Sequence, residues 1–261
     1  MSRSLLAFLL FCVVLLVASA GVVWFMGLTL AGIAVDGERR QNPYYLLQLL
    51  PEAALTSGAA SADSEVLASD AAAPSYRARF VTQAVQDQGR VMWRTGPVAV
   101  VEGSVRLDVA GLQLLEFATG GNLVQMLTSS SYRGLEASAG RGVHLVGSPV
   151  APGELPADEP AVVVLYRDQA DGPTVLLGAP GESGWLGPLP RYGGTVSWHA
   201  PVAMVRGDQP WNRLLVLQFP ETSAAEAWLA DPVTATERAI ARKYVDSVSV
   251  LMAEPAQAMW R

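Results

Sequence analysis

The sequence predicts an α+β protein in which two copies of a β-α-β-β-α-β unit follow an apolar amino-terminal helix. The chain of 261 residues is 51% apolar and 16% charged, and residues 5–35 hold 26 apolar residues out of 31 and no charge. Beyond this run the chain repeats itself. Pro97–Gly103 returns as Pro201–Gly207 at a spacing of 104 residues. Leu114–Phe117 returns as Val216–Phe219 at a spacing of 102 residues, and such repeats indicate an internal duplication.

The amino-terminal segment, residues 1–40, has the pattern of a signal anchor followed by a short tether. The hydrocarbon core of a bilayer needs about 20 apolar residues, and the run continues for 15 uncharged residues beyond Ala20, so we expect a single transmembrane helix. The alternative is a signal peptide that is cleaved after Ala20. Arg3 before the span and Arg39–Arg40 after it nearly balance, and the signal-like start favours a bacterial inner-membrane protein with a periplasmic body.

The first unit, residues 41–148, alternates short apolar strands with helical patterns. Its expected elements are the strand Tyr44–Leu50, the helix Arg77–Gln88 stopped by Gly89, the strands Val91–Val101 and Leu112–Ala118, the helix Asn122–Ser138 and the strand Val143–Gly147. Residues 53–73 are rich in Ala, Ser and Asp and lack apolar periodicity, which predicts a flexible insertion after the first strand.

The second unit, residues 161–261, repeats the same order behind a proline-rich linker, residues 149–160. Its expected elements are the strand Ala161–Arg167, a helix or irregular turn within Leu176–Tyr192, the strands Thr195–Val205 and Arg213–Phe219, the helix Ser223–Tyr244 and the strand Val248–Ala253. Ser223 and Glu226 have the spacing of a capping box at the start of the last helix. Pro232 should break that helix after two turns.

Both units therefore follow a ferredoxin-like plan, in which two helices cover one face of a four-stranded antiparallel sheet. Apolar residues occupy both faces of strands such as Ala161–Tyr166 and Leu214–Leu217, so the second face of each sheet should be buried as well. Two units in one chain can bury these faces by packing sheet against sheet.

The second unit resembles the family catalogued as domain of unknown function 1330, within the dimeric α+β barrel superfamily. The matching residues are Arg191–Gly194, Asn212–Pro220, Ala227–Trp228 followed by Asp231–Pro232, and Val248–Glu254. The resemblance covers about 95 residues of the second unit and, more loosely, about 105 of the first. It implies that the two units pair as an intramolecular barrel pseudo-dimer, because members of that superfamily pair two chains through their sheets.

The family commonly carries an arginine nine residues before the glycine that ends the second strand. Arg94 has this spacing before Gly103, whereas Trp198 has it before Gly207, with His199 beside it. If the arginine marks a pocket, only the first unit retains it.

Several classes of function are disfavoured by the residues that are present. Beyond the apolar run there are 17 basic and 24 acidic side chains without a basic cluster, which argues against a nucleic-acid partner. The only two histidines are His144 and His199, and the single cysteine, Cys12, lies in the apolar run, so we expect no metal site and no cofactor. We find no nucleophile elbow and no phosphate-binding loop.

A small set of residues is left as candidates for ligand binding. Arg94, Tyr192, Trp198 and His199 would surround a ligand between the sheets, and Trp185 and Trp211 lie in Gly/Pro-rich loops where they could rim a pocket or a partner surface. The only catalytic candidates are His199 and Arg94. His199 qualifies because imidazole titrates near neutrality. His144 is better explained as a core or surface residue.

The sequence favours a membrane-anchored, envelope-facing binding or assembly module, such as an accessory subunit of a membrane complex, and it leans away from an enzyme. The tether of about eight residues would hold the body within about 25 Å of the bilayer, close to protein partners in the membrane. The alternative is a small-molecule enzyme or ligand sensor that uses a cavity between the two sheets. A degenerate pair kept only for structure is a third possibility.

Overall fold

The computed structural model describes residues 41–56, 75–103, 107–138, 142–168, 184–243 and 245–256. The predicted anchor in residues 1–40 and most of the predicted insertion lie outside these ranges. Among the residues that are described, no helix combines the length and apolarity needed to cross a membrane.

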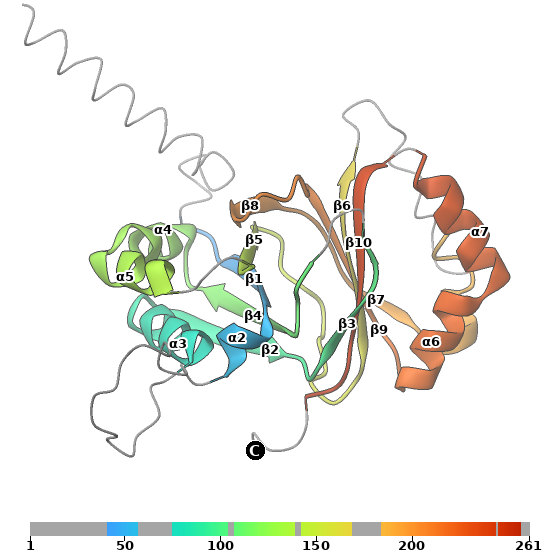
Figure 1. Ribbon diagram of the computed structural model, residues 1–261, viewed down its shortest axis with the longest axis horizontal. Coiled ribbons are helices and arrows are strands. Elements are labelled where there is room, and N and C mark those ends of the chain that lie inside the picture. Colours follow the sequence, from blue (N-terminus) through green and yellow to red (C-terminus); the bar gives the residue numbers. More distant parts are fainter. Residues whose placement is uncertain are drawn as a thin grey trace, which may run out of the picture.

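The body consists of two five-stranded antiparallel sheets that face each other, with helices on their outer sides (Figure 1). In spatial order, the first sheet holds β2 (Gly89–Arg94), β4 (Gly111–Phe117), β1 (Tyr44–Leu50), β5 (His144–Ser148) and β8 (Ala203–Arg206). The second sheet holds β3 (Val98–Gly103), β10 (Val245–Ala253), β6 (Ala161–Asp168), β9 (Arg213–Gln218) and β7 (Thr195–Pro201). The predicted α+β class with two antiparallel sheets is confirmed.

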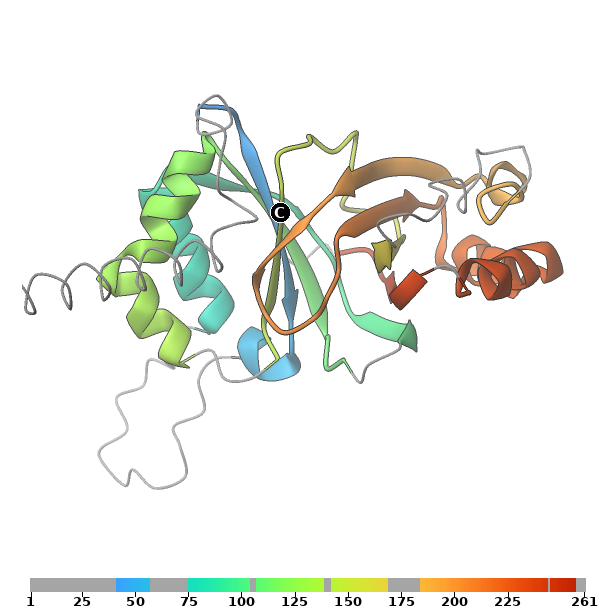
Figure 2. The same cartoon turned by 90° about the horizontal axis from the view of Figure 1, so that it is seen from above.

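Each sheet borrows one strand from the other unit, which the sequence analysis did not predict. Residues 91–101 and 195–205 were expected to form one strand each, but both strands are interrupted near a proline, at Pro97 and Pro201. Proline has no backbone N–H to donate to a sheet ladder. After each interruption the chain crosses over, so that β3 pairs with β10 and β8 pairs with β5 (Figure 2).

The helices of the first unit differ from the prediction at three places. The expected helix over 122–138 is two helices, α4 (Gly120–Thr128) and α5 (Ser130–Ser138), because Ser129 between them has an extended backbone with ψ 152°. The helix α3 (Tyr76–Gln86) ends before Gln88, which has φ 60°, and Gly89 already belongs to β2. A short helix, α2 (Glu52–Leu55), was not expected.

The long helix of the second unit is also split, here as predicted at Pro232. The helix α6 (Thr222–Ala230) ends at Asp231, whose carboxylate accepts hydrogen bonds from the backbone of Val233 and Thr234 and so caps α7 (Pro232–Ala241). The predicted capping box is wrong, because Glu221 occupies the N-cap position without a side-chain cap bond and Ser223 lies inside the helix. The short 3₁₀ helix η1 (Leu189–Tyr192) precedes β7.

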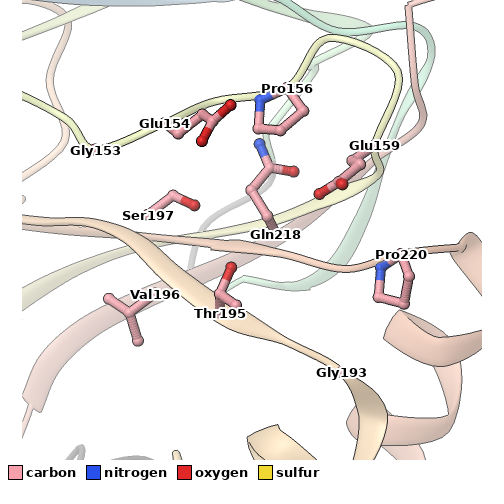
Figure 3. Close-up of a pocket in the computed structure, with 10 residues that line it drawn as sticks. All are labelled: Gly153, Glu154, Pro156, Glu159, Gly193, Thr195, Val196, Ser197, Gln218 and Pro220. Atoms are coloured by element: carbon pink, nitrogen blue, oxygen red, sulfur yellow. The ribbon is translucent and has the colours of Figure 1, made fainter.

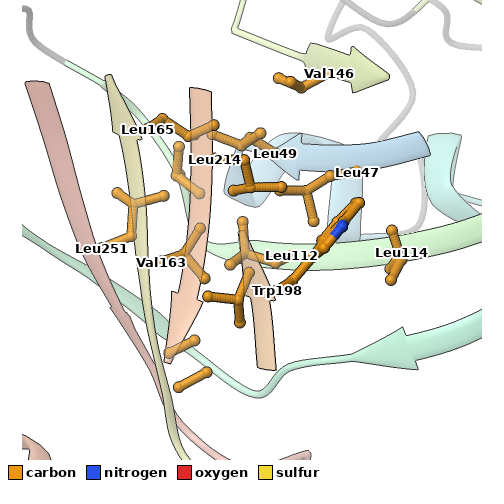
Figure 4. Packing of buried hydrophobic residues seen from close by; sticks show 14 of the residues in the cluster. Leu47, Leu49, Leu112, Leu114, Val146, Val163, Leu165, Trp198, Leu214 and Leu251 are labelled. Carbon is orange, nitrogen blue, oxygen red and sulfur yellow. The ribbon is translucent and has the colours of Figure 1, made fainter. Parts of the chain in front are cut away.

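The space between the two sheets is filled with apolar side chains rather than hollow. Leu47 and Leu114 from the first sheet meet Val163, Leu214 and Trp198 from the second, and all are buried (Figure 4). Two further apolar clusters lie between each sheet and its own helices. Both faces of both sheets are therefore buried, as the strand composition predicts, and each large side chain contributes about 1.5–3 kcal/mol.

Candidate functional site

The six ligand-binding candidates from the sequence do not meet in one place. Trp198 is buried between the sheets, where its indole N–H donates to the carbonyl of Val150 at 3.0 Å. His199 follows it on β7 and therefore lies on the opposite face. There its Nε2 is 3.2 Å from the hydroxyl of Tyr166. Burial and nearby Arg213 lower the pKa of His199.

Arg94 lies far from this pair in the fold. Its neighbour Trp93 belongs to the cluster between the sheets, so Arg94 lies on the helix-covered face of the first sheet. There its Nε donates to Gln113 at 3.0 Å, and Gln113 donates to Gln48 at 2.9 Å. Burial, and secondarily the charge of Arg77, lowers the pKa of the Arg94 guanidinium.

The strand register also corrects which residue of the second unit corresponds to Arg94. Counted back nine residues from Gly207, the residue that corresponds to Arg94 is Trp198. In the sheets, however, Trp93 lies opposite Leu114 and Trp198 lies opposite Val216, each after a bulge. His199 therefore stands where Arg94 stands in the first unit. The spacing misleads because the chain from the tryptophan to the final glycine is one residue shorter in the second unit.

The remaining three candidates have structural contacts of their own. The hydroxyl of Tyr192 donates to Asp231 at 2.8 Å, a bond that raises the pKa of the tyrosine and lowers that of the carboxyl group. Trp185 stacks on Trp228 beneath α6, with ring centroids 5.8 Å apart. Trp211 packs edge-to-face against His144, whose pKa is lowered chiefly by burial.

A cavity of about 430 Å³ lies instead between the linker and β7, near the end of β9 (Figure 3). Its lining residues are Gly153, Glu154, Pro156, Glu159, Gly193, Thr195, Val196, Ser197, Gln218 and Pro220. Polar groups from three separate segments thus surround one space.

Gln218 is the most unusual of these residues. It follows Leu214 and Val216 along β9, so its side chain continues the row that faces the first sheet. The residue is only 1% exposed, and within the described structure neither its Oε1 nor its Nε2 has a hydrogen-bond partner. Burial of an unsatisfied amide costs about 1–3 kcal/mol. A bound molecule that satisfies the amide would remove this cost.

The linker forms a fixed wall of the cavity, because it is bonded to both sheets. The backbone N–H of Gly153 donates to the carbonyl of Ser197 on β7 at 2.7 Å. The indole of Trp198 donates to Val150, and the indole of Trp93 on the first sheet donates to Pro156 at 3.3 Å. A Cβ atom on Gly153 would lie 2.9 Å from the Ser197 carbonyl oxygen, so only glycine permits this approach.

The first unit shows why there is room for a cavity here. Gln218 lies opposite Ala161 on β6 and Thr195 on β7. At the matching position of the first unit, Glu116 lies opposite Tyr45 on β1 and Arg90 on β2. There the Tyr45 hydroxyl donates to Glu116 at 3.5 Å, and Arg90 forms an ion pair with it. The second unit has small side chains in place of the phenol ring and the guanidinium group.

The lining chemistry suits a ligand that donates hydrogen bonds. In Figure 3 the carboxylates of Glu154 and Glu159 point toward the same space as the Gln218 amide, with the hydroxyls of Thr195 and Ser197 beside them. None of the ten lining residues is basic. Two carboxylates can pair with a cation or accept a proton. Across the described ranges, no group of three or more His, Cys, Asp or Glu side chains is placed to hold a metal ion.

The sequence did not indicate this site, because the proline-rich linker has the composition of a spacer and Gln218 lies within a repeated strand. A signal was present in the repeat itself. The LLEF and VLQF copies differ by a charge, since Glu116 corresponds to Gln218. A charged residue at one of two repeated positions and a neutral residue at the other indicates that their environments differ.

Comparison with known proteins gives structural neighbours only. No family model matches the chain, so the resemblance to domain of unknown function 1330 is not confirmed. No curated protein matches it. An anthrone oxidase-like protein aligns with a TM-score of 0.46 at 12% identity, over 82% of this chain and 91% of that one.

Two further solved structures align at similar length. A mutant chlorite dismutase from Candidatus Nitrospira defluvii has a TM-score of 0.40 at 10% identity, over 87% of this chain and 95% of that one. A protein described as a monooxygenase, from Lactobacillus acidophilus, has a TM-score of 0.37 at 7% identity, over 81% and 93%.

These neighbours correct one expectation from the sequence. The lean away from an enzyme is contradicted, because the solved structures that align over most of the chain are described as an oxidase-like protein, a monooxygenase and a chlorite dismutase. Since the identities are low, we take no reaction or cofactor from them.

Proposed function

We propose that this protein binds a small polar molecule carrying an ammonium or guanidinium group, in the cavity between the linker and β7. The observation that carries the proposal is the buried amide of Gln218, which lines the cavity without a partner in the described structure. A buried polar group without a partner is rare in folded proteins. Its retention here is explained by a ligand that completes its hydrogen bonds.

The charge of the ligand follows from the lining. Glu154 and Glu159 place two negative charges at the cavity, and no lining residue offers a positive one. A cation would be attracted, and an anion would be repelled by both carboxylates. The amide carbonyl of Gln218 and the hydroxyls of Thr195 and Ser197 can accept further hydrogen bonds from the ligand.

This proposal favours the small-molecule alternative over an assembly module. It places the ligand at the margin of the two sheets rather than at the centre, where apolar side chains fill the space. The protein would act as an enzyme or as a sensor on the bound molecule. In either role Gln218 orients the ligand, and the carboxylates bind its charge and can accept its proton.

A matched set of three probes tests the charge preference. Butylamine, butyramide and butyrate have similar size and differ in charge, and each is titrated into the full-length protein in mild detergent by saturation-transfer NMR. We expect butylamine to bind with a Kd on the order of millimolar, as a fragment of this size allows. Butyramide should bind at least about tenfold more weakly, which corresponds to about 1.4 kcal/mol.

Variants then locate the binding. Gln218→Met and Glu159→Gln should each weaken butylamine binding by about tenfold or more. Glu226→Gln, which removes an exposed carboxylate of α6 outside the cavity, should leave it unchanged. Butyrate binding as strongly as butylamine, or butylamine binding that survives Gln218→Met, would show that the proposal is wrong.

A further inference from the structure

The two strands that cross between the units carry opposite charges at matching positions. We call β3 and β8 the exchanged strands. Glu102 near the end of β3 lies opposite Val250 of β10, and Arg206 at the end of β8 lies opposite Leu145 of β5. In both pairs a register shift immediately precedes the charged residue. Glu102 and Arg206 are also equivalent in the sequence repeat, 104 residues apart.

Each charge meets the opposite charge on a helix of the other unit. Glu102 lies 3.2 Å from the Nε atom of Arg238 on α7 and also contacts Arg242, and the Glu102 side chain is only 10% exposed. Arg206 lies 3.9 Å from the carboxylate of Glu136 on α5 and donates to the Glu136 carbonyl at 3.5 Å. The Arg206 side chain is 19% exposed.

The helix partners are themselves equivalent and opposite. Glu136 is the seventh residue of α5, and Arg238 is the seventh residue of α7, 102 residues later. The two units therefore differ in the sign of the charge at both positions, on the exchanged strand and on the receiving helix. A single reversal would have placed like charges together.

We propose that this double reversal makes each unit accept the other unit and reject a second copy of itself. If two first units exchanged strands, Glu102 of one would meet Glu136 of the other. If two second units did so, Arg206 would meet Arg238. Like charges brought together in a half-buried position disfavour a pairing strongly, and such repulsion is a known source of partner choice.

The apolar parts of the exchanged strands are too similar to distinguish the two units. The segments that contain them, PVAVVEG at 97–103 and PVAMVRG at 201–207, are nearly the same apart from the charge. The clearest difference between the exchanged strands is therefore the charge, and the five charged residues at the two contacts are the ones to test. This inference does not depend on the ligand cavity.

A helix variant, Glu136→Arg with Arg238→Glu and Arg242→Glu, tests the inference in the full-length chain in mild detergent. It places like charges at both contacts within the chain and opposite charges between identical units of two chains. We expect a melting temperature at least about 5 °C lower than that of the parent protein. We also expect dimers or larger species, which size-exclusion chromatography with light scattering measures by mass.

A full-reversal variant adds Glu102→Arg and Arg206→Glu to the helix variant, so every contact within the chain is again between opposite charges. The two variants have the same net charge, because the added substitutions cancel. We expect the full reversal to regain the mass and the melting temperature of the parent protein. It remains informative even if the helix variant does not fold, because it contains all three helix substitutions.

Three outcomes would overturn the inference. The first is a helix variant with the mass and melting temperature of the parent protein. The second is a full-reversal variant that stays destabilised or stays oligomeric. The third is a helix variant that is destabilised and rescued but never changes mass, since the contacts would then stabilise the fold without selecting the partner.

Discussion

The end of β4 in the first unit and the end of β9 in the second unit occupy the same place in the fold and have opposite character. In the first unit the position is Glu116, which Tyr45 and Arg90 engage from the two neighbouring strands. In the second unit the position is Gln218, whose cross-strand neighbours are Ala161 and Thr195. One position is plugged by an aromatic ring and an ion pair, and the other borders a cavity.

The two positions differ by three side chains on matching strands, and the second unit also has the linker, which supplies Glu154 and Glu159 to the cavity. The edge strands β2 and β7 pair with β4 and β9 in matching registers. Each edge strand has a bulge beside a buried tryptophan, Trp93 or Trp198. What changes is side-chain volume and the number of partners available to the central polar group. In the first unit these side chains contact one another, and in the second unit their counterparts leave the amide of Gln218 without a partner in the described structure.

The largest expected effect comes from removing the ring of Tyr45 beside Glu116 in the first unit. Tyr45→Ala removes a ring that is 7% exposed and that packs edge-to-face on Trp198, with centroids 6.3 Å apart. We expect it to lower the free energy of unfolding by about 3–5 kcal/mol, the range for truncation of a buried aromatic residue. Chemical denaturation measures this directly.

The control for this change is Tyr45→Phe, which keeps the ring and loses only the 3.5 Å hydrogen bond to Glu116. It should cost about 1 kcal/mol or less. If Tyr45→Ala lowered the free energy of unfolding no more than Tyr45→Phe does, the ring would not be what fills the space beside Glu116. The comparison between the two units would then be wrong.

A smaller effect, of opposite sign, is expected on the open side. Gln218→Met replaces a buried amide without partners by an apolar side chain of similar length, so we expect the ligand-free protein to gain about 1–3 kcal/mol of stability. Ligand binding should be lost at the same time. Such an exchange of stability for binding is typical of functional sites.

The matched substitution in the first unit sharpens this result. Glu116→Met removes the partner of Tyr45 and Arg90, and should destabilise the protein by about 1 kcal/mol or less, because the Arg90 side chain is 74% exposed. Methionine at two equivalent positions would then change the free energy of unfolding in opposite directions. Destabilisation by both would show that the Gln218 amide is satisfied in solution.

The smallest expected effect concerns pH, with one histidine in each unit. Burial lowers the pKa of His144, with Asp208 raising it and Arg206 lowering it further. Burial also lowers the pKa of His199. The unfolded chain, with a histidine pKa near 6.5, therefore binds more protons than the folded one below that pH.

This contribution to stability is present above about pH 6.5 and is lost as the pH falls through the folded pKa values. Denaturation between pH 7 and 5 should show it as a decreasing free energy of unfolding. His144→Gln should flatten the slope more than His199→Gln, because His144 is 8% exposed whereas His199 is exposed. A slope that neither substitution alters would assign the pH dependence to carboxylates.

Much of the fold could be predicted because local patterns carry it. The strand Tyr44–Leu50 was predicted at its observed bounds, and the break at Pro232 was predicted from the geometry of proline. The break at Ser129 was not, since serine tolerates both helical and extended backbone. The exchange of β3 and β8 was also missed, because periodicity shows that a segment is a strand but not which strand it pairs with.

The candidate site could not be predicted, because its parts are polar residues with ordinary local roles. Glu154 and Glu159 belong to the linker, and Gln218 lies 59 residues beyond Glu159 in a strand that is otherwise apolar. The six residues chosen from the sequence were conspicuous for their chemistry. Most of them pack against neighbours in separate places.

The sequence by itself indicated an internal repeat, and it predicted the α+β class and strands that are buried on both faces. The repeat is read from matching segments 102 and 104 residues apart, and the class and the burial follow from composition and periodicity over a few residues at a time. Only the tertiary structure decided that the inter-sheet core is packed, that the units exchange strands, and that a cavity opens beside Gln218. Those outcomes depend on the volumes and charges of side chains from segments that are far apart in the sequence. A local sequence pattern does not show which of these side chains come together.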